Sequence, residues 1–230
     1  MSAARVVAAV IPAYDAEATV AEVVRRTRAL IPEVVVVDDG SDDGTADAAA
    51  GAGARLLRHA RNRGKGRALR TAFEDLFARG YEAVVSLDAD GQHLPEEIPR
   101  LLDAARRGAD LVVGARAHLF DEMHWMRRAS NHWSSRAISG FAGVHLPDAQ
   151  SGFRLYSRAL LEATGFPEAR FEAESAVLVR AARRGFRLAF VPVRLGHADG
   201  RTSSHYRPLV DSFRIAGAVI AARFAHSNGG

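Results

Sequence analysis

Hydrophobic residues in the first half of the chain occur in short continuous runs that alternate with segments of helical periodicity. Apolar runs rich in β-branched residues are typical of strands buried on both faces of a sheet. The expected strands span residues 6–11, 34–37, 54–57, 83–87 and 111–113, and Pro12 is expected to end the first. The expected helices span residues 16–30, 45–52, 66–79 and 95–107. This alternation predicts an α/β fold with a mainly parallel central sheet flanked by helices.

The pattern changes after residue 114. Residues 123–141 form a long polar segment, which we interpret as helix or loop. Beyond it we expect helices at 159–163 and 172–184, a strand at 187–191 and a C-terminal helix at about 208–224. Because neither a linker nor an internal repeat interrupts the chain, we expect a single domain over residues 1–230.

Composition supports a soluble globular protein. The 230 residues are 48% hydrophobic and 25% charged, and there is no cysteine, which excludes disulfides and thiolate metal sites. No segment resembles a secretory leader, so we expect a cytoplasmic protein. The longest uncharged apolar stretch near the C-terminus, residues 215–222, is too short to span a bilayer.

The net charge of +4 comes from 30 arginines and a single lysine, Lys65. An arginine-rich surface binds phosphates or anionic lipids, but a compositional bias towards arginine codons explains the total equally well. We therefore expect no nucleic-acid partner from the charge alone, and give more weight to the position of Lys65.

Acidic residues follow two of the expected strands. Asp88 and Asp90 end the run at 83–87, and Asp38 and Asp39 end the run at 34–37. In an open parallel sheet, ligands bind beyond the carboxyl ends of the strands, where these acids would meet. Paired carboxylates supply the hard oxygen ligands that a divalent cation carrying a diphosphate requires. Each pair taken singly also fits an acidic turn after a strand.

Two other segments complete this expected edge. Tyr14 follows the first strand and offers a ring for a nucleotide base, while Asp38 or Asp39 would accept hydrogen bonds from base or ribose. Lys65 lies between two glycines just before a helix, where an anion is favoured. Because a glycine follows the lysine, the spacing is not that of an ATP-cleaving P-loop.

Six segments in this order resemble the family 2 glycosyltransferases, nearest to the dolichyl- or polyprenyl-phosphate mannose synthases. The resemblance covers roughly residues 6–195, and its specificity lies in the ordered set. The segments are Ile11–Tyr14, Asp38–Thr45, Asn62–Gly66, Asp88–His93, Gly114–Arg116 and Ser151–Arg154.

The resemblance implies a GT-A fold, a single Rossmann-like domain that uses a GDP- or UDP-linked sugar with Mg²⁺ or Mn²⁺ and inverts the anomeric carbon. Residues up to about 114 would form the nucleotide-binding half, and residues 115–230 the acceptor side. The implied metal ligands are Asp88, Asp90 and Gln92, with Asp90 counted as catalytic. The implied nucleotide or diphosphate contacts are Pro12, Tyr14, Asp38, Asp39, Ser41, Lys65 and Asp88.

The acceptor decides which further residues take part. A lipid phosphate is already anionic and needs cationic positioning, for which Arg116 is the implied residue, with Arg127 or Arg128 and Ser135 in support. A hydroxyl acceptor needs a general base, and Glu172 or Glu174 is the candidate.

Residues 200–207 resemble the basic flap that closes over the diphosphate in these enzymes. Ser204-His205 replaces the Ser-Lys common in the mannose synthases, and His205 is the candidate for a phosphate or a metal contact there. An apolar stripe in residues 209–224 either packs on the domain or rests on an anionic membrane.

The expected function is therefore sugar transfer from a nucleotide to an acceptor, most simply a polyprenyl phosphate. Rival interpretations are transfer to a hydroxyl, a nucleotidyltransferase, and a non-catalytic nucleotide-sugar-binding protein. A nucleotidyltransferase would carry a glycine-rich basic signature directly after the first strand, where this chain has Ile11–Tyr14. Oligomeric state is not indicated by the sequence.

Overall fold

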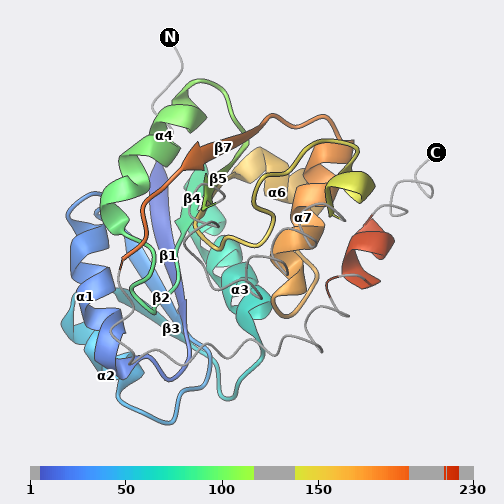
Figure 1. Cartoon of the computed structure of the whole chain (residues 1–230). Helices are drawn as coiled ribbons and strands as arrows, with labels where there is room; N and C mark the ends of the chain where they lie inside the picture. The colour runs from blue at the N-terminus through green and yellow to red at the C-terminus, as the bar shows by residue number, and fades with distance from the viewer. Residues whose placement is uncertain (1–5, 117–137, 197–214, 216, 223–230) are drawn as a thin grey trace.

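A computed structural model describes residues 6–116, 138–196, 215 and 217–222 of the chain. In this part, seven strands form one sheet in the order β3-β2-β1-β4-β6-β5-β7 (Figure 1). The strands are β1 (Val7–Ala13), β2 (Val34–Asp38), β3 (Arg55–Arg58), β4 (Ala83–Ser86), β5 (Leu111–Ala115), β6 (Arg154–Ser157) and β7 (Leu188–Pro192).

Helices cover both faces of the sheet (Figure 1). The cluster under α1, α2 and α4 includes Val34 and Val36, whereas the cluster under α3, α6 and α7 includes Val35 and Val37. Successive residues of a strand point to opposite faces, so an unbroken valine run serves both clusters. The helices are α1 (Glu17–Arg28), α2 (Thr45–Gly51), α3 (Lys65–Ala78), α4 (Ile98–Arg106) after a 3₁₀ turn (Pro95–Glu97), α6 (Arg158–Thr164) and α7 (Glu172–Arg183).

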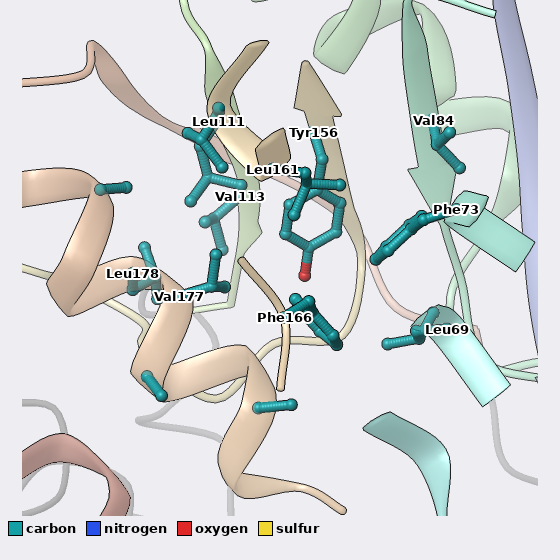
Figure 2. Packing of buried hydrophobic residues seen from close by; sticks show 14 of the residues in the cluster. Leu69, Phe73, Val84, Leu111, Val113, Tyr156, Leu161, Phe166, Val177 and Leu178 are labelled. Carbon is teal, nitrogen blue, oxygen red and sulfur yellow. The ribbon is translucent and has the colours of Figure 1, made fainter. Parts of the chain in front are cut away.

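Aromatic rings fill the core between α3, α6 and the sheet (Figure 2). Phe73 lies edge-on to Tyr156 and to Phe166, with ring centroids 5.4 and 5.3 Å apart. Such edge-to-face pairs are favourable beyond the area that they bury. They fix α3, and with it the residues at its N-terminus, against the centre of the sheet.

The sheet is mixed rather than wholly parallel. Strand β6 pairs antiparallel with both β4 and β5, and places Tyr156 opposite Val84 and Leu111. The other four pairings are parallel, so the expected mainly parallel α/β fold is confirmed. The sequence pattern predicts no strand at 154–157, which is wrong, because these residues form β6. The segment has only four residues and begins with an arginine, so it lacks the pattern of a buried strand.

Pro12 does not end β1, contrary to expectation. The strand continues to Ala13, and Pro12 stands opposite Val37 of β2. The neighbouring strand β4 has already ended at Ser86, which stands opposite Val10. The position where Pro12 lacks an N–H faces the β4 side of the strand. The carbonyl of Val10, two residues earlier, accepts the N–H of Leu87 on that same side. The proline therefore costs the sheet no ladder hydrogen bond.

The remaining expected elements agree within one or two residues where they are described. Residues 138–142 are helical, as are 215 and 217–222, and the rest of the expected segments at 123–141 and 208–224 lies outside the described residues. Among the described residues, no helix is both long and apolar enough to span a bilayer.

Candidate active site

A cavity of about 600 Å³ opens beyond the carboxyl ends of β1, β2 and β4. The segments after these strands, which the sequence predicted to share one edge, all line it, and the first turns of α3 and the approach to α7 complete the wall. Its lining includes Pro12, Tyr14, Asp15, Glu17, Asp39, Asp43, Asn62, Lys65, Asp88, Asp90, Arg170 and Phe171.

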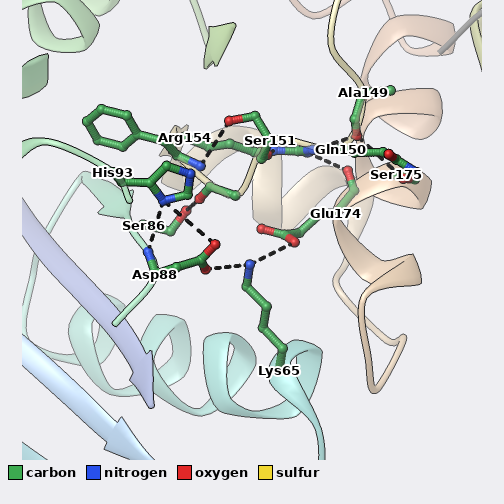
Figure 3. Close-up of polar contacts among 12 residues, drawn as sticks. Lys65, Ser86, Asp88, His93, Ala149, Gln150, Ser151, Arg154, Glu174 and Ser175 are labelled. Atoms are coloured by element: carbon green, nitrogen blue, oxygen red, sulfur yellow. Dashed lines mark hydrogen bonds and ion pairs between the residues drawn. The ribbon is translucent and has the colours of Figure 1, made fainter. Parts of the chain in front are cut away.

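Lys65 joins the two halves of the chain at this cavity (Figure 3). Its Nζ lies 2.6 Å from Asp88 Oδ1 and 3.1 Å from Glu174 Oε2. Burial opposes the charge of Lys65, but the two carboxylates outweigh it and raise the lysine pKa above its usual value. Burial likewise acts to raise the pKa of Asp88, whereas Lys65 and then His93 lower it, to about 2. Asp88 is thus an ionised carboxylate.

Asp90 is the second acid on the cavity wall. Its Oδ1 accepts a hydrogen bond from the Gln92 N–H at 2.9 Å. Burial and then the charge of Asp88 raise the pKa of Asp90 above its usual value. Two carboxylates that repel one another in a shared cavity favour a bound cation.

The donor set fits a divalent cation that arrives with a diphosphate. Mg²⁺ is commonly held by one or two carboxylates, with water and substrate phosphates as the other ligands, and Mn²⁺ has the same preference for oxygen. The described residues contain no group of three or more His, Cys, Asp or Glu side chains that could hold a metal ion by themselves. Asp88 and Asp90 would hold the ion, whereas Gln92 does not line the cavity and its ligand role stays a prediction.

His93 anchors the acidic loop from inside. Its Nδ1 accepts the backbone N–H of Asp88 at 3.2 Å, and its ring stacks on Phe153 with centroids 5.4 Å apart. Burial, opposed by the charge of Asp88, lowers the pKa of His93 to about 4. The ring is therefore neutral near pH 7, with its proton on Nε2.

Asp38 and Ser41 lie behind the cavity wall rather than on it. The Asp38 carboxylate is fully buried, accepts the Ser41 N–H at 2.9 Å and lies 2.9 Å from Arg58 Nε. Ser41 Oγ accepts the Asp15 N–H at 3.0 Å. Both residues brace the loop after β2, and their predicted contact with a nucleotide stays a prediction. Pro12, Tyr14 and Asp39, by contrast, do line the cavity.

The glycines around Lys65 make room for another part of the chain. A Cβ on Gly64 would lie 2.5 Å from the carbonyl oxygen of Ala169, and one on Gly66 would lie 2.5 Å from that of Glu168. Gly64 also has a φ of +97°, which favours glycine. The approach to α7 thus packs directly on the first turn of α3, as the hydrogen bond from the Arg67 N–H to the Ala169 carbonyl confirms.

Arg116 is held by a buried partner that the sequence analysis did not identify. Its Nε lies 2.8 Å from Asp148 Oδ2 and its second terminal nitrogen 3.1 Å from Oδ1, a two-pronged ion pair. Asp148 also accepts the backbone N–H groups of Arg116, Gln150 and Ser151. Burial opposes the charge of Arg116, but Asp148 raises the pKa of its guanidinium. The side chain is 18% exposed, and its predicted acceptor contact stays a prediction.

Arg154 has a structural role that the sequence pattern does not indicate. Its guanidinium is fully buried and donates to the carbonyls of Ser151 at 2.6 Å, Ala149 at 2.8 Å and Glu174 (Figure 3). It therefore ties the loop before β6 to the first turn of α7. An arginine within the segment Gly-Phe-Arg-Leu-Tyr gives no sign that its side chain is as fully buried as those of its apolar neighbours.

The two candidate bases lie in the first turn of α7. Glu174 is buried and paired with Lys65, but its Oε1 has no hydrogen-bond partner among the described residues. Glu172 accepts the Arg170 N–H at 3.2 Å, and its Oε2 is likewise buried without a partner. The other acceptor-side predictions, Arg127, Arg128, Ser135 and His205, lie outside the described residues.

Comparisons with known proteins agree on one family. The family model described as glycosyl transferase family 2 matches residues 8–165. The chain is 34% identical over 197 residues to an undecaprenyl-phosphate mannosyltransferase of Micrococcus luteus, covering 80% of this chain and 81% of that protein. It is 35% identical over 164 residues to a polyprenol monophosphomannose synthase of Mycolicibacterium smegmatis, covering 66% and 62%.

Another relative is longer. The chain is 36% identical over 171 residues to an undecaprenyl-phosphate 4-deoxy-4-formamido-L-arabinose transferase of Aeromonas hydrophila, 69% of this chain but only 51% of that protein. The chain thus spans about half the length of this relative.

A solved structure shows the same fold. Glucosyl-3-phosphoglycerate synthase from Mycobacterium tuberculosis, crystallised with Mn²⁺, UDP and phosphoglyceric acid, superposes with a TM-score of 0.73 at 23% identity. The superposition covers 98% of this chain and 81% of that one, and confirms the expected GT-A fold.

Proposed function

The chain belongs to glycosyl transferase family 2, and from this premise we propose that it transfers a sugar from a nucleoside diphosphate to a polyprenyl phosphate. The observation that supports a nucleoside diphosphate sugar as the donor is the placement of Asp88 and Asp90 on one cavity wall, with Lys65 Nζ 2.6 Å from Asp88. A polyprenyl phosphate as the acceptor is supported by relatives whose names include undecaprenyl phosphate or polyprenol.

The reaction is a single displacement with inversion. An oxygen of the acceptor phosphate attacks the anomeric carbon, the bond from that carbon to the diphosphate breaks, and the nucleoside diphosphate leaves with the electron pair. No proton need be removed from an acceptor phosphate that is already anionic. The catalytic demand is therefore to align the reactants and to stabilise charge on the leaving group.

Mg²⁺ or Mn²⁺ held by Asp88 and Asp90 would supply Lewis-acid stabilisation of the departing diphosphate. Lys65 adds a fixed positive charge next to Asp88, so it is well placed to contact the diphosphate as well. Tyr14 and Asp39 also line the cavity, and they are proposed to contact the nucleoside. We propose either GDP or UDP as the nucleotide.

Arg116 is proposed to hold the acceptor phosphate. Two nitrogens of its guanidinium are paired with Asp148, which orients the side chain while leaving it partly exposed. Because this acceptor is a lipid, we also propose that the protein acts at the cytoplasmic face of a membrane, as a single domain that binds there peripherally.

One observation supports a second candidate, transfer to a hydroxyl. Within the part of the chain that the structure describes, the buried Oε1 of Glu174 has no hydrogen-bond partner, so this carboxylate retains an oxygen that could take a proton. Against this role, its other oxygen is 3.1 Å from Lys65, and pairing with an ammonium makes a carboxylate a weaker base.

The decisive experiment is a screen of GDP- and UDP-sugars with Mn²⁺, in the presence and absence of a polyprenyl phosphate. The quantity measured is the nucleoside diphosphate that is released. The proposal expects release that depends strongly on the lipid phosphate. Glu174→Gln separates the candidates, because a phosphate acceptor should still react whereas a hydroxyl acceptor should not. Tight metal-dependent nucleotide binding without turnover under any condition would instead indicate a non-catalytic binding protein.

A further inference from the structure

A buried histidine, His59, lies behind Asp39 on the cavity wall and has no part in the reaction as described. His59 is 7% exposed and Asp39, which lines the cavity, is 3% exposed. His59 Nδ1 lies 2.6 Å from Asp39 Oδ1, and its Nε2 lies 3.0 Å from Thr71 Oγ1. Three separate segments, after β2, after β3 and within α3, meet in this arrangement.

The hydrogen-bond roles follow from the chemistry of the groups. An ionised carboxylate only accepts, so His59 Nδ1 must carry a proton and donate it to Asp39. In a neutral ring Nε2 then accepts from the Thr71 hydroxyl. Thr71 and Asp39 together fix the tautomer and the ring plane of His59.

Asp39 receives two further hydrogen bonds from the chain. The Arg63 N–H donates to Oδ1 at 3.0 Å and the Gly64 N–H donates to Oδ2 at 2.7 Å. A carboxylate has about four acceptor sites, and the three donors found among the described residues leave one of these sites, on Oδ2, for a ligand in the cavity. The orientation of that remaining site depends on the donor bonded to the opposite oxygen.

We propose that His59 is a positioning residue, which holds Asp39 so that its remaining oxygen site accepts a hydrogen bond from an N–H or O–H group of the donor's nucleoside. This inference rests on the proposed function. His59 does not touch the ligand itself, so its effect should fall on nucleotide affinity and spare the acceptor.

The test compares two amides that replace different nitrogens of the ring. The amide nitrogen of His59→Asn can reach the place of Nδ1 and still donate to Asp39, whereas His59→Gln extends towards Thr71. His59→Ala removes both interactions, Thr71→Val removes only the second, and His145→Ala is the control at an exposed histidine.

Binding of UDP and GDP with Mn²⁺ is measured by calorimetry, together with KM for donor and acceptor and the melting temperature.

The expected result is a rise of about 10-fold in the nucleotide Kd and the donor KM for His59→Ala and His59→Gln, the value of one hydrogen bond to a charged group. His59→Asn should recover most of this loss, and Thr71→Val should lose less than His59→Ala. Acceptor KM and kcat should stay within about 2-fold of wild type, because the hydrogen bond that is lost does not involve the acceptor.

Three outcomes overturn the inference: equal nucleotide affinity in the Asn and Gln variants, equal effects on donor and acceptor, or an affinity unchanged in all His59 variants. Should His59→Ala fail to fold, the Asn and Gln pair still decides. The failure of the proposed function looks different, because wild-type protein would then bind neither nucleotide, or would release no nucleoside diphosphate from any sugar donor.

Discussion

At the scale of single residues, the only lysine of the chain lies among acids. Lys65 neutralises one of the three carboxylates formed by Asp88, Asp90 and Glu174, so this group retains a net negative charge. The pair Lys65–Asp88 is buried, where an opposite charge matters more than at the surface. The site is thus arranged for one more cation, and Asp90 is the acid without a basic partner among the described residues.

Asp90→Asn should lower turnover at least about 100-fold, because one oxygen ligand at the leaving group is lost. Asp103→Asn, at an exposed carboxylate, is the matched control and should leave turnover unchanged. Release of nucleoside diphosphate measures both, and Mn²⁺ titration followed by electron paramagnetic resonance reports the loss of metal binding directly. Near-normal turnover with normal metal affinity would remove Asp90 from the site.

Asp90 should also give the reaction an acid limit. Burial and the Asp88 charge raise its pKa, so on acidification it takes up a proton at a higher pH than an ordinary aspartate, and a protonated carboxyl is a poor ligand. Asp88, with a pKa of about 2, stays ionised through the same range. Apparent Mn²⁺ affinity should therefore fall as pH falls. An affinity independent of pH down to about 4, the ordinary pKa of an aspartate, would contradict this assignment.

Arg116→Ala should impair use of the acceptor far more than hydrolysis of the donor. The side chain carries the cation proposed for the acceptor phosphate, and a charged hydrogen bond of this kind is worth about 10-fold or more in affinity. Acceptor KM and donor hydrolysis without acceptor are measured in parallel. Equal losses in both would argue against a phosphate acceptor at this position.

The strand-end acids and the lysine could be predicted from sequence because their signal is local: an apolar run that stops at charged residues. Their partners could not. Glu174 pairs with Lys65 and Asp148 with Arg116 across long stretches of chain, and only the topology of the sheet brings them together. The same holds for His59, since nothing near it in sequence indicates that it meets Asp39 and Thr71.

At the scale of elements, the loop before β6 and the start of α7 depend on one side chain. Arg154 satisfies three backbone carbonyls in a fully buried position, without a carboxylate partner among those contacts. A buried guanidinium is tolerable only when its donors are satisfied in this way.

Arg154→Leu should lower the free energy of unfolding by about 3 kcal/mol or more, because buried carbonyls left without donors cost about 1–3 kcal/mol each. Arg183→Leu, at an exposed position in the last turn of α7, is the control and should change stability little. Urea unfolding followed by circular dichroism measures both. A change below about 1 kcal/mol for Arg154→Leu would show that the loop and α7 hold together without it.

Element prediction succeeded where periodicity was strong and failed at β6. The helices and strands of the first half follow from uninterrupted valine runs and regular apolar spacing. Strand β6 is four residues long and starts with a charged residue, so neither length nor pattern distinguishes it from a loop. It is also antiparallel to both of its neighbours. Its place in the sheet is a property of the whole topology.

At the scale of the whole molecule, nucleotide and metal should stabilise the fold together. A ligand that binds only the native state at 100 times its Kd adds about 2.7 kcal/mol of stability, or roughly 5–10 °C in melting temperature for a chain of this size. We expect this shift for the preferred one of UDP and GDP with Mn²⁺, and its loss on adding EDTA. A shift that survives EDTA would show that the nucleotide binds independently of the cation.

The antiparallel insertion of β6 has a consequence for synthesis on the ribosome. Strands β4 and β5 are translated well before the segment that separates them, so in a nascent chain that ends before Arg154 the described partners β6 and β7 are missing: β4 lacks one neighbour and β5 lacks both. Completion of the sheet must wait for sequence-distant pairing, which is intrinsically slow. A polypeptide truncated at residue 150 should therefore aggregate or recruit chaperones rather than persist as an autonomous half.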